Sequence, residues 1–394
     1  MKNKFASHRN FIFFNYPVKY SIKEYVGTVE KIGKKYLVNN IEAVYTDGTI
    51  SNPGISDIDI ILVAKNSSAP KLKFVWLNKN ERNMVCHPFY IIDRNTMKNI
   101  RWMYPDFKLE LVKGKKIDIK NPTEKELKCL RIFLMVDIMI RHFPRDYLEM
   151  TVPKLINVRN ALLRLNALNH SISTFGMLGI RKKEWDSYAK EVKELRNAWF
   201  EISEQEKTKS VVKLLKNAIL ISMSMIDELS LLIKKEGLTS IISGKGECIY
   251  NGSQNMAFFV EKWDKHSALK RMAGFYMQNK KFYSVFPLNL LPLLMEYSKG
   301  EGLLSSYMQK NLENSSIDYE IKCKGVIRKR IYLLNMQAHL AYKMKHLHFT
   351  AFFDYGYKST SGILNKCIYA ARKIKNSSIF KETLPRLTGK SLQY

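Results

Sequence analysis

Cysteine is scarce in this sequence, and its cysteines are never closely spaced. The chain has five in 394 residues, and none forms the Cys-x-x-Cys pair of a zinc site. An odd number of scattered cysteines also differs from the framework of a disulfide-stabilised secreted protein. The sequence therefore predicts a chain without a disulfide framework or a structural zinc site, in a reducing, cytoplasmic location. The five are Cys86, Cys129, Cys248, Cys323 and Cys367.

Long hydrophobic runs are also missing. The most apolar stretch, residues 214–233, is interrupted by Lys216, Asp227 and Glu228, whereas a membrane span needs about 20 mostly apolar residues. Residues 1–17 begin with basic residues, but they have only a short apolar run and no small-residue cleavage site, so we do not expect a signal peptide. The hydrophobic fraction of 46% nonetheless predicts a globular protein with a substantial core.

Acidic residues are outnumbered by basic ones. The chain has 65 Lys and Arg against 36 Asp and Glu, a net charge of +29. Residues 237–394 carry 24 basic and 10 acidic residues, whereas residues 121–236 carry 20 and 15. This excess predicts a polyanionic partner, either nucleic acid or the phosphates of a nucleotide. The alternative is that lysines only solvate the surface, and the uneven distribution argues against that as the whole explanation.

We expect an α+β fold in three regions. Residues 1–120 combine a helix with short apolar runs bounded by Gly, Pro, Asn or Asp, which predicts a mixed sheet with helices. Residues 121–236 have helical periodicity, and residues 237–394 form a basic, mixed, mainly helical region with one strong helix at 326–345. The first region has an expected helix at 21–38 and expected strands at 41–45, 58–64, 73–77, 89–92 and 108–112.

Residues 46–63 combine a glycine turn with a closely spaced pair of acids. Asp57 and Asp59 share one face of the expected strand, because successive side chains of a strand alternate. Two carboxylates this close do not both stay ionised cheaply unless a cation neutralises them. Mg²⁺ binds one or two carboxylates together with substrate phosphates. Just upstream, Gly48 and Thr49 offer backbone amides and a hydroxyl to such phosphates.

Gly48-Thr49, followed on the next strand by Asp57-x-Asp59, resembles the signature of the polymerase-beta-type nucleotidyltransferase superfamily. That signature is Gly-Ser or Gly-Gly, a short spacer and then Asp-x-Asp. The resemblance covers about residues 20–120. It implies a nucleotidyltransferase-like mixed sheet followed by a helical domain. It also implies two Mg²⁺ ions, a bound nucleoside triphosphate such as ATP, and transfer of a nucleoside monophosphate with loss of pyrophosphate.

The resemblance assigns catalytic roles to particular residues. Asp57 and Asp59 are the expected metal ligands, and a later strand is expected to supply a third carboxylate. Asp93 is the first candidate for this third acid, and His87, which shares its strand face, is a partner or a substitute. Glu110 is the second candidate. The third acid matters because the general base that activates the attacking hydroxyl would otherwise be missing.

The expected nucleotide-binding residues flank the aspartate pair. Gly48 and Thr49 are expected to contact the triphosphate, with Ser51, Ser56 and Lys65 nearby. We therefore predict an enzyme that moves a nucleoside monophosphate to a hydroxyl or another nucleophile. The acceptor stays open among a small molecule, a protein side chain and an RNA end.

Two alternatives come from other classes of function. One is a catalytically inactive nucleotide- or nucleic-acid-binding protein that keeps the phosphate site but lacks the third carboxylate. The other is a helical ribonuclease in residues 121–236, regulated by the first domain. Arg164 and His170 in this region resemble the Arg-x(4–6)-His pattern of small helical ribonuclease domains, and such pairs are also common by chance.

Two further patterns lie in the C-terminal region. His346 and His348 stand at strand spacing near Asp354, an arrangement that can bind a metal but more often belongs to a surface or a core. In the expected helix at 326–345, basic residues alternate with tyrosines, which suits the phosphates and bases of a nucleic acid. A helix with an apolar inner face and solvated lysines explains the same pattern.

Overall fold

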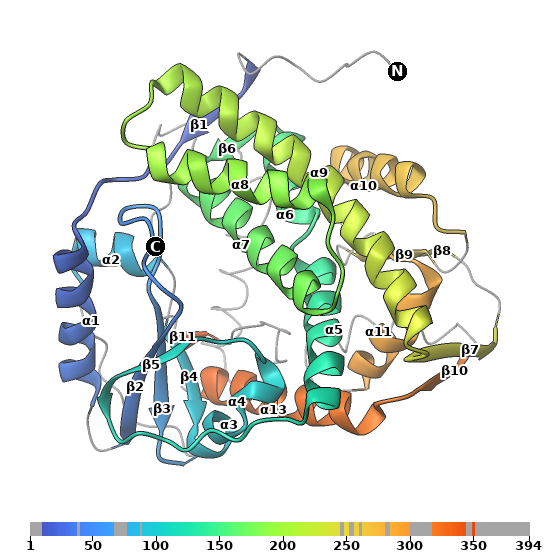
Figure 1. The fold of residues 1–394 in the computed structure, drawn as a ribbon, viewed down its shortest axis with the longest axis horizontal. Coiled ribbons are helices and arrows are strands. Elements are labelled where there is room, and N and C mark those ends of the chain that lie inside the picture. Colours follow the sequence, from blue (N-terminus) through green and yellow to red (C-terminus); the bar gives the residue numbers. More distant parts are fainter. Residues whose placement is uncertain are drawn as a thin grey trace.

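The computed structural model describes residues 10–37, 40–66, 77–86, 89–244, 248–251, 256–259, 262–279, 284–299, 317–343 and 349–350. Within these ranges the protein has an α+β fold, as the sequence predicts, with a central mixed sheet, smaller sheets and a larger mass of helices (Figure 1). No helix in these ranges is both long and apolar enough to cross a membrane. Four histidines and acids considered above lie outside the described residues: His87, His346, His348 and Asp354.

The largest sheet contains the strands expected in the first region. They are β2 (Ile41–Asp47), β3 (Asp59–Ala64), β4 (Phe89–Asp93) and β5 (Leu109–Gly114), and β11 (Phe349–Thr350) adds an edge. The order across the sheet is β11-β4-β3-β2-β5. Strand β3 runs parallel to β4 and antiparallel to β2, and β5 is antiparallel to β2. The expected strand at 73–77 lies almost entirely outside the described residues.

The two faces of this sheet belong to different cores. Ile60 and Leu62 of β3 join a cluster that includes helix α1 (Ile22–Tyr36) on one face. Ile61 and Val63 join the main core, to which the later helices contribute. The alternation expected for this strand is therefore confirmed. Short helices connect the strands: α2 (Lys79–Val85), α3 (Arg94–Lys98) and α4 (Ile100–Met103).

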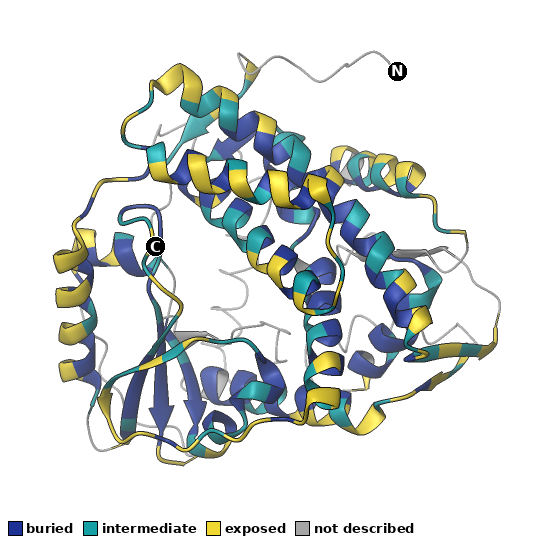
Figure 2. Ribbon diagram, viewed as in Figure 1, coloured by how far each residue is buried: buried dark blue, intermediate teal, exposed yellow. Residues whose placement is uncertain are grey.

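The second region is helical, as predicted, apart from one short strand. Its helices are α5 (Glu124–Arg141), α6 (Arg145–Thr151), α7 (Val158–Met177), α8 (Lys183–Ala198) and α9 (Glu204–Lys235), with strand β6 (Leu155–Asn157) before α7. Strand β1 (Ile12–Phe14) pairs in parallel with β6, so the N-terminal strand packs with the helices and not with the large sheet. Figure 2 shows strands β2–β4 buried and the outer faces of α1 and α8 exposed.

The third region does not pack by itself. Strand β10 pairs with β7, and helix α13 packs against β4, α4 and α5. The strong helix expected near 326–345 therefore joins the core of the first two regions. The elements are β7 (Thr239–Ser243), β8 (Cys248–Asn251), β9 (Met256–Phe259), α10 (Lys265–Asn279), η2 (Leu288–Leu290), α11 (Leu291–Ser298), β10 (Asp318–Ile321) and α13 (Lys324–Lys343).

Candidate functional site

The loop between β2 and β3, residues 48–58, contains the glycine turn and the beginning of the acidic motif. Helix α1 holds it from one side: Tyr25 Oη donates to the Ser56 carbonyl at 2.7 Å and accepts from the Gly54 N–H at 2.9 Å. Gly54 has a φ of +91°, and a Cβ there would overlap the Val18 carbonyl oxygen. Only glycine therefore fits at this position without strain.

Two buried arginines hold the same loop from the helical region. Arg159 of α7 donates to the Ser56 carbonyl at 3.1 Å and to the Ile55 carbonyl at 3.4 Å. Arg196 of α8 donates to Ser56 Oγ at 3.3 Å and to Asn52 Oδ1 at 3.1 Å. The two residues are only 7% and 3% exposed. Side chains far along the chain therefore fix the position of this loop.

Asp57 and Asp59 stand where the loop enters β3, and both lie near side chains of the helical region. Asp57 is within electrostatic range of Arg164 on α7 and of Arg196 on α8. Asp59 is within range of His170 on α7. Burial lowers the pKa of Arg196 to about 10, and Asp57 acts in the opposite direction. The aspartate pair thus faces positive groups from two helices.

Asp47 adds a third carboxylate to the sheet side of the site. As the last residue of β2, it lies directly opposite Asp59 in the antiparallel register, so the two side chains share a face. Its Oδ1 accepts from the Lys108 N–H at 2.8 Å. Burial and then the charge of Asp59 raise the pKa of Asp47 to about 6. A bound cation would relieve this repulsion between like charges.

On the helical side of the site, opposite the sheet, a cluster of charged side chains holds Arg164 in place. The Asp146 carboxylate lies 3.1 Å from Nε of Arg164 and 3.2 Å from Nδ1 of His142. Arg145 Nε lies 3.5 Å from the same carboxylate. Burial alone would raise the pKa of Asp146, but Arg164, His142 and then Arg145 hold it well below its usual value. The Arg164 side chain remains 37% exposed, so it is both anchored and accessible.

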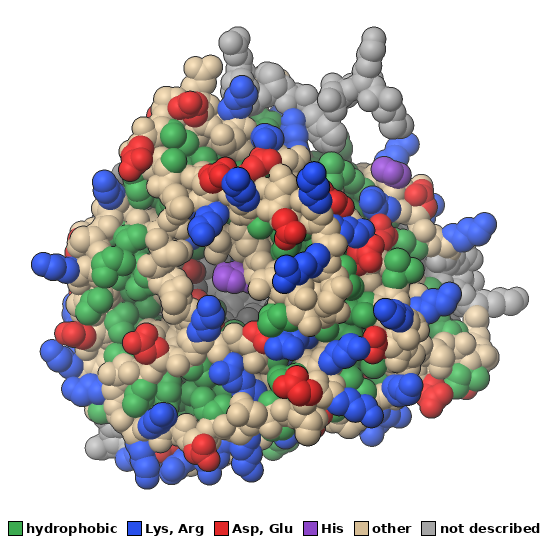
Figure 3. Space-filling view, in the orientation of Figure 1, with side chains coloured by type: hydrophobic (Ala, Val, Ile, Leu, Met, Phe, Trp, Pro, Cys, Tyr) green, Lys and Arg blue, Asp and Glu red, His purple; other side chains and the backbone are tan. Residues whose placement is uncertain are grey.

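His170 of α7 lies on the helical side of the aspartate pair. His170 is exposed, yet enough protein surrounds it that burial lowers its pKa, and the charges of Arg196 and Lys108 lower it further. These two facts together indicate a side chain at the edge of a concave surface. Figure 3 shows such a hollow near the centre of the view, with a histidine and several Lys and Arg side chains around it.

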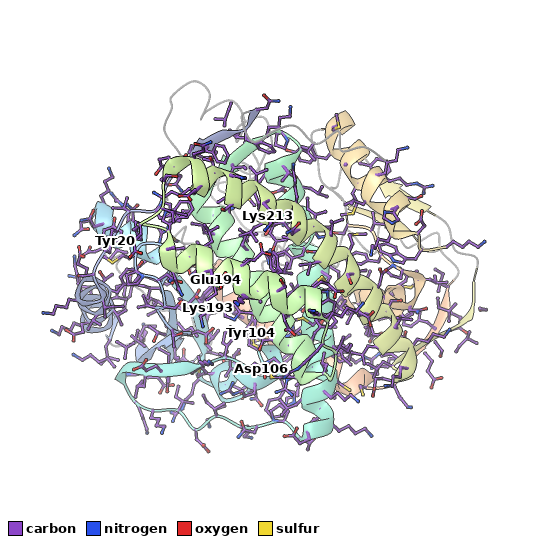
Figure 4. The ribbon with its side chains drawn as sticks, turned by 45° about the horizontal axis from the view of Figure 1, so that its top comes forward. Tyr20, Tyr104, Asp106, Lys193, Glu194 and Lys213 are labelled. Atoms are coloured by element: carbon purple, nitrogen blue, oxygen red, sulfur yellow. The ribbon has the colours of Figure 1, made fainter. Side chains whose placement is uncertain are left out.

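Aromatic side chains lie beside the aspartate pair. Tyr104 stacks on Phe107, with ring centroids 4.3 Å apart. Tyr90 of β4 is within electrostatic range of both aspartates and of Tyr104, and burial raises its pKa well above the usual value. Figure 4 shows Tyr104 in the connection between α4 and β5, below the labelled residues of α8. Tyr104 is only 3% exposed and belongs to the main core, so these rings support the sheet side of the site from within.

The expected phosphate-binding residues fall into two groups. Gly48, Thr49 and Ser51 are exposed. Gly48 has a φ of +78°, and a Cβ there would meet nothing within 4 Å, so the space beside the turn is open. Ser56 is buried, and its Oγ accepts from the Asn52 N–H at 3.2 Å. The turn is thus available to a ligand, whereas Ser56 holds the loop together.

Asp93 and Lys65 lie at the other end of the sheet. In the parallel register of β3 and β4, Asp93 is opposite Ala64, which is about 16 Å along the strand from Asp59. Its Oδ1 accepts from the Thr96 N–H at 2.7 Å and caps α3. Lys65 follows β3 and is exposed. The structure brings neither residue to the aspartate pair.

Glu110, the second candidate for the third acid, is at the right end of the sheet but on its other face. Glu110 of β5 pairs with Thr46 of β2. The next residue of β2, Asp47, pairs with Asp59 of β3. Successive side chains of a strand point to opposite faces. Glu110 is also exposed, so the sheet directs it away from the other acids.

The carboxylates suit a metal ion that arrives with its own ligands. Among the described residues, no group of three His, Cys, Asp or Glu side chains could hold a metal ion. Asp57 and Asp59 supply two carboxylates at most, and Asp47 lies beside them. Mg²⁺ accepts this number when phosphates and water complete its shell. The donor set therefore fits a Mg²⁺–nucleotide complex better than an ion held by the protein alone.

Arg164 and His170 both lie on α7, but they contact different groups. Arg164 contacts Asp146, and its Nη1 lies 3.5 Å from His142 Nδ1. His170 Nε2 lies 3.3 Å from Asn166 Nδ2. The two residues expected from the ribonuclease pattern are therefore part of the wall that faces the aspartate pair.

Sequence reasoning missed several residues of this site. Asp47 directly precedes Gly48, and the alternation of β2 could have indicated its face. Arg159 and Arg196 have no such local signal, because their partners lie 103 to 144 positions away. Asp146 also lacks a local signal, because nothing in the sequence around it distinguishes it from other acids on helices.

Comparisons of this chain with protein-family models, with curated proteins and with solved structures find no match. The function of this chain is therefore inferred from its site: the spacing of the acids, the arginine near Asp57 and the open turn at Gly48.

Proposed function

We propose that this protein is a Mg²⁺-dependent nucleotidyltransferase, which moves a nucleoside monophosphate from a nucleoside triphosphate to an acceptor nucleophile. The observation that best supports this is the opposition of charges between the sheet and the helices. Asp57 on the sheet side lies within electrostatic range of Arg164 on α7 and of Arg196 on α8. A Mg²⁺–triphosphate complex matches both sides, because the metal suits carboxylates and the phosphate oxygens suit cations.

Each side of the hollow has a separate role in this proposal. Asp57 and Asp59 hold the metal, and the open turn at Gly48 and Thr49 binds phosphate through its N–H groups and hydroxyl. Arg164, which Asp146 holds in place, donates to a phosphate oxygen and orients it. When bound, Mg²⁺ supplies neutralisation of the charge on the phosphate oxygens.

Asp47 is the residue best placed to take the proton of the acceptor. It shares a sheet face with Asp59, and burial raises its pKa, which makes its carboxylate a stronger base. From the sequence we expect Asp93 in this role, but Asp93 caps α3 at the far end of the sheet. The acceptor itself stays open among a small molecule, a protein side chain and an RNA end.

A nucleotide-binding protein without transferase activity is the second candidate. It is favoured by the finding that no three-ligand metal group occurs in the part of the chain that the structure describes. Two carboxylates bind a metal–nucleotide complex, but two-metal catalysis commonly needs more ligands. The candidates differ in one product, since only a transferase releases pyrophosphate.

Calorimetric titration of nucleotides tests both candidates. ATP, GTP, CTP and UTP, each with Mg²⁺, would be titrated into the wild-type protein and the Asp57→Asn/Asp59→Asn variant. We expect Mg²⁺-dependent binding that weakens at least tenfold in the variant. Lys65→Ala is the matched control, because it removes a charge at the far end of β3 and should bind normally.

The outcomes separate the candidates. Pyrophosphate release from bound nucleotide, with water and the protein itself as acceptors, would support the transferase. Binding without release would favour the second candidate. If no triphosphate binds to folded wild-type protein, both candidates are wrong.

A further inference from the structure

Two cysteines from distant parts of the chain meet where helix α13 begins. Cys129 lies in α5, Cys323 directly precedes α13, and their Sγ atoms are 2.8 Å apart across a sequence separation of 194. A disulfide bond has an S–S distance of about 2.05 Å. The two sulfurs therefore need to approach by less than an ångström to become bonded.

The two thiols differ in their access to solvent. Cys129 is 5% exposed, whereas Cys323 is partly exposed. Burial, followed by the hydrogen bond and the charge of Cys323, raises the pKa of Cys129 to about 12. Cys129 thus keeps its proton in the reduced protein. A reagent from solvent therefore reaches and reacts with Cys323 first.

The surroundings of Cys323 also favour an anionic reagent. Lys322 and Lys324 flank it in the sequence, and both are exposed. Positive charge around a partly exposed thiol raises the local concentration of anions such as glutathione. Cys86 has no such flanking pair: its neighbours in the sequence are Val85 and His87.

We propose that Cys129 and Cys323 form a reversible disulfide, a redox-modification site that is independent of the nucleotide site. The oxidant is a disulfide such as oxidised glutathione. The Cys323 thiolate attacks it, one glutathione leaves as a thiol, and a mixed disulfide remains on Cys323. Cys129 loses its proton to water and attacks the Cys323 sulfur, and the second glutathione leaves and takes up a proton. Two protein thiols are oxidised, and one glutathione disulfide is reduced to two thiols.

This disulfide would add a covalent bond to an interface that polar contacts already stabilise. Helix α13 packs against α5, where Arg330 pairs with Asp137 in a fully buried ion pair. The disulfide would fix the beginning of α13, whereas the ion pair holds its middle. A cross-link between segments so far apart in the sequence restricts the unfolded chain strongly, so the oxidised protein should be more stable.

Peptide mapping tests the proposal directly. The full-length protein, with Cys248→Ser and Cys367→Ser, would be equilibrated at increasing ratios of oxidised to reduced glutathione, alkylated and digested. We expect a linked peptide pair that contains Cys129 and Cys323. Cys323→Ser should abolish this product, and Cys86→Ser, which removes another partly exposed free thiol, should leave it unchanged.

Thermal unfolding gives a second readout. Oxidation should raise the Tm by on the order of 5 °C when both cysteines are present. It should leave the Tm of Cys323→Ser unchanged, and this variant is expected to fold because Cys323 is partly exposed. If both cysteines are alkylated even in oxidised glutathione alone, or if Cys323 carries only glutathione, the proposal is wrong.

Discussion

The two ends of strand β3 accommodate acidic side chains in opposite ways. At its beginning, Asp59 lies opposite Asp47 and near His170 of α7. Beside its end, Asp93 of β4 accepts from the backbone N–H of Thr96, three residues further on. The first acid depends on side chains from remote helices, whereas the second is satisfied within its own turn. Asp93 is therefore held by its own turn, whereas Asp59 stands among groups contributed by β2 and α7.

Removing Asp146 should cause the largest loss of stability among the substitutions considered. In Asp146→Ala, Arg164, Arg145 and His142 lose the carboxylate that they share, so two arginines remain beside each other without it. We expect the free energy of unfolding to fall by about 3 kcal/mol, as for other buried charges that lose a partner. Urea denaturation at pH 7 measures this loss.

Glu149→Ala is the matched control for that prediction. Glu149 also lies on α6, and its nearest oxygen is 3.9 Å from Arg145 Nε, with both side chains 35% exposed. A partly exposed pair of this kind contributes about 0–1 kcal/mol. Equal losses in the two variants would contradict a special role for Asp146.

Asp47→Asn should change how stability depends on pH. The pKa of Asp47 is about 6 in the folded protein and near 3.8 when unfolded, because burial and the Asp59 charge disfavour its ionised form. The folded protein thus binds this proton more tightly, and its stability falls as the pH rises from about 4 to 6. Asparagine does not ionise, and its side-chain oxygen can still accept from Lys108 N–H. At pH 7 we expect the free energy of unfolding of the variant to be higher by about 1–2 kcal/mol. This is less than the full pKa shift implies, because water screens part of the electrostatic interaction.

Urea denaturation at pH 4, 5, 6 and 7 would check this prediction. The difference between Asp47→Asn and the wild type should grow across this window and level off above pH 6. A constant difference at all four values would show that the pKa of Asp47 is not raised in the folded protein.

Much of the fold was predictable because its signals are local. The apolar runs of the first region gave strands β2 to β5, and their bounds follow the Gly, Asn and Asp residues between them. Ser21 and Glu24 form a capping box at the start of α1, and Thr123 and Glu126 do so at α5. The β1–β6 pair and the packing of α13 on β4 were not predictable, because each joins segments far apart in the sequence.

The same distinction applies to the candidate site. Strand alternation predicts Asp57 and Asp59 on one face from the local sequence alone, and in the structure Asp57 ends the loop and Asp59 begins β3. The position of Asp93 depends on the register between β3 and β4, which the sequence does not specify. Arg159 and Arg196 were missed for the same reason, since only the folded chain places them against the loop.

The smallest effect is expected at the far end of β3. Asp93→Ala removes the side chain that caps α3, which should lower the free energy of unfolding by about 1 kcal/mol. Mg²⁺–nucleotide affinity should stay unchanged, because about 16 Å of strand separates Asp93 from Asp59. Asp59→Asn should have the reverse profile, with weakened nucleotide binding. The pair of variants therefore compares the two ends of the strand: a loss of affinity in Asp93→Ala would mean that both ends take part in nucleotide binding.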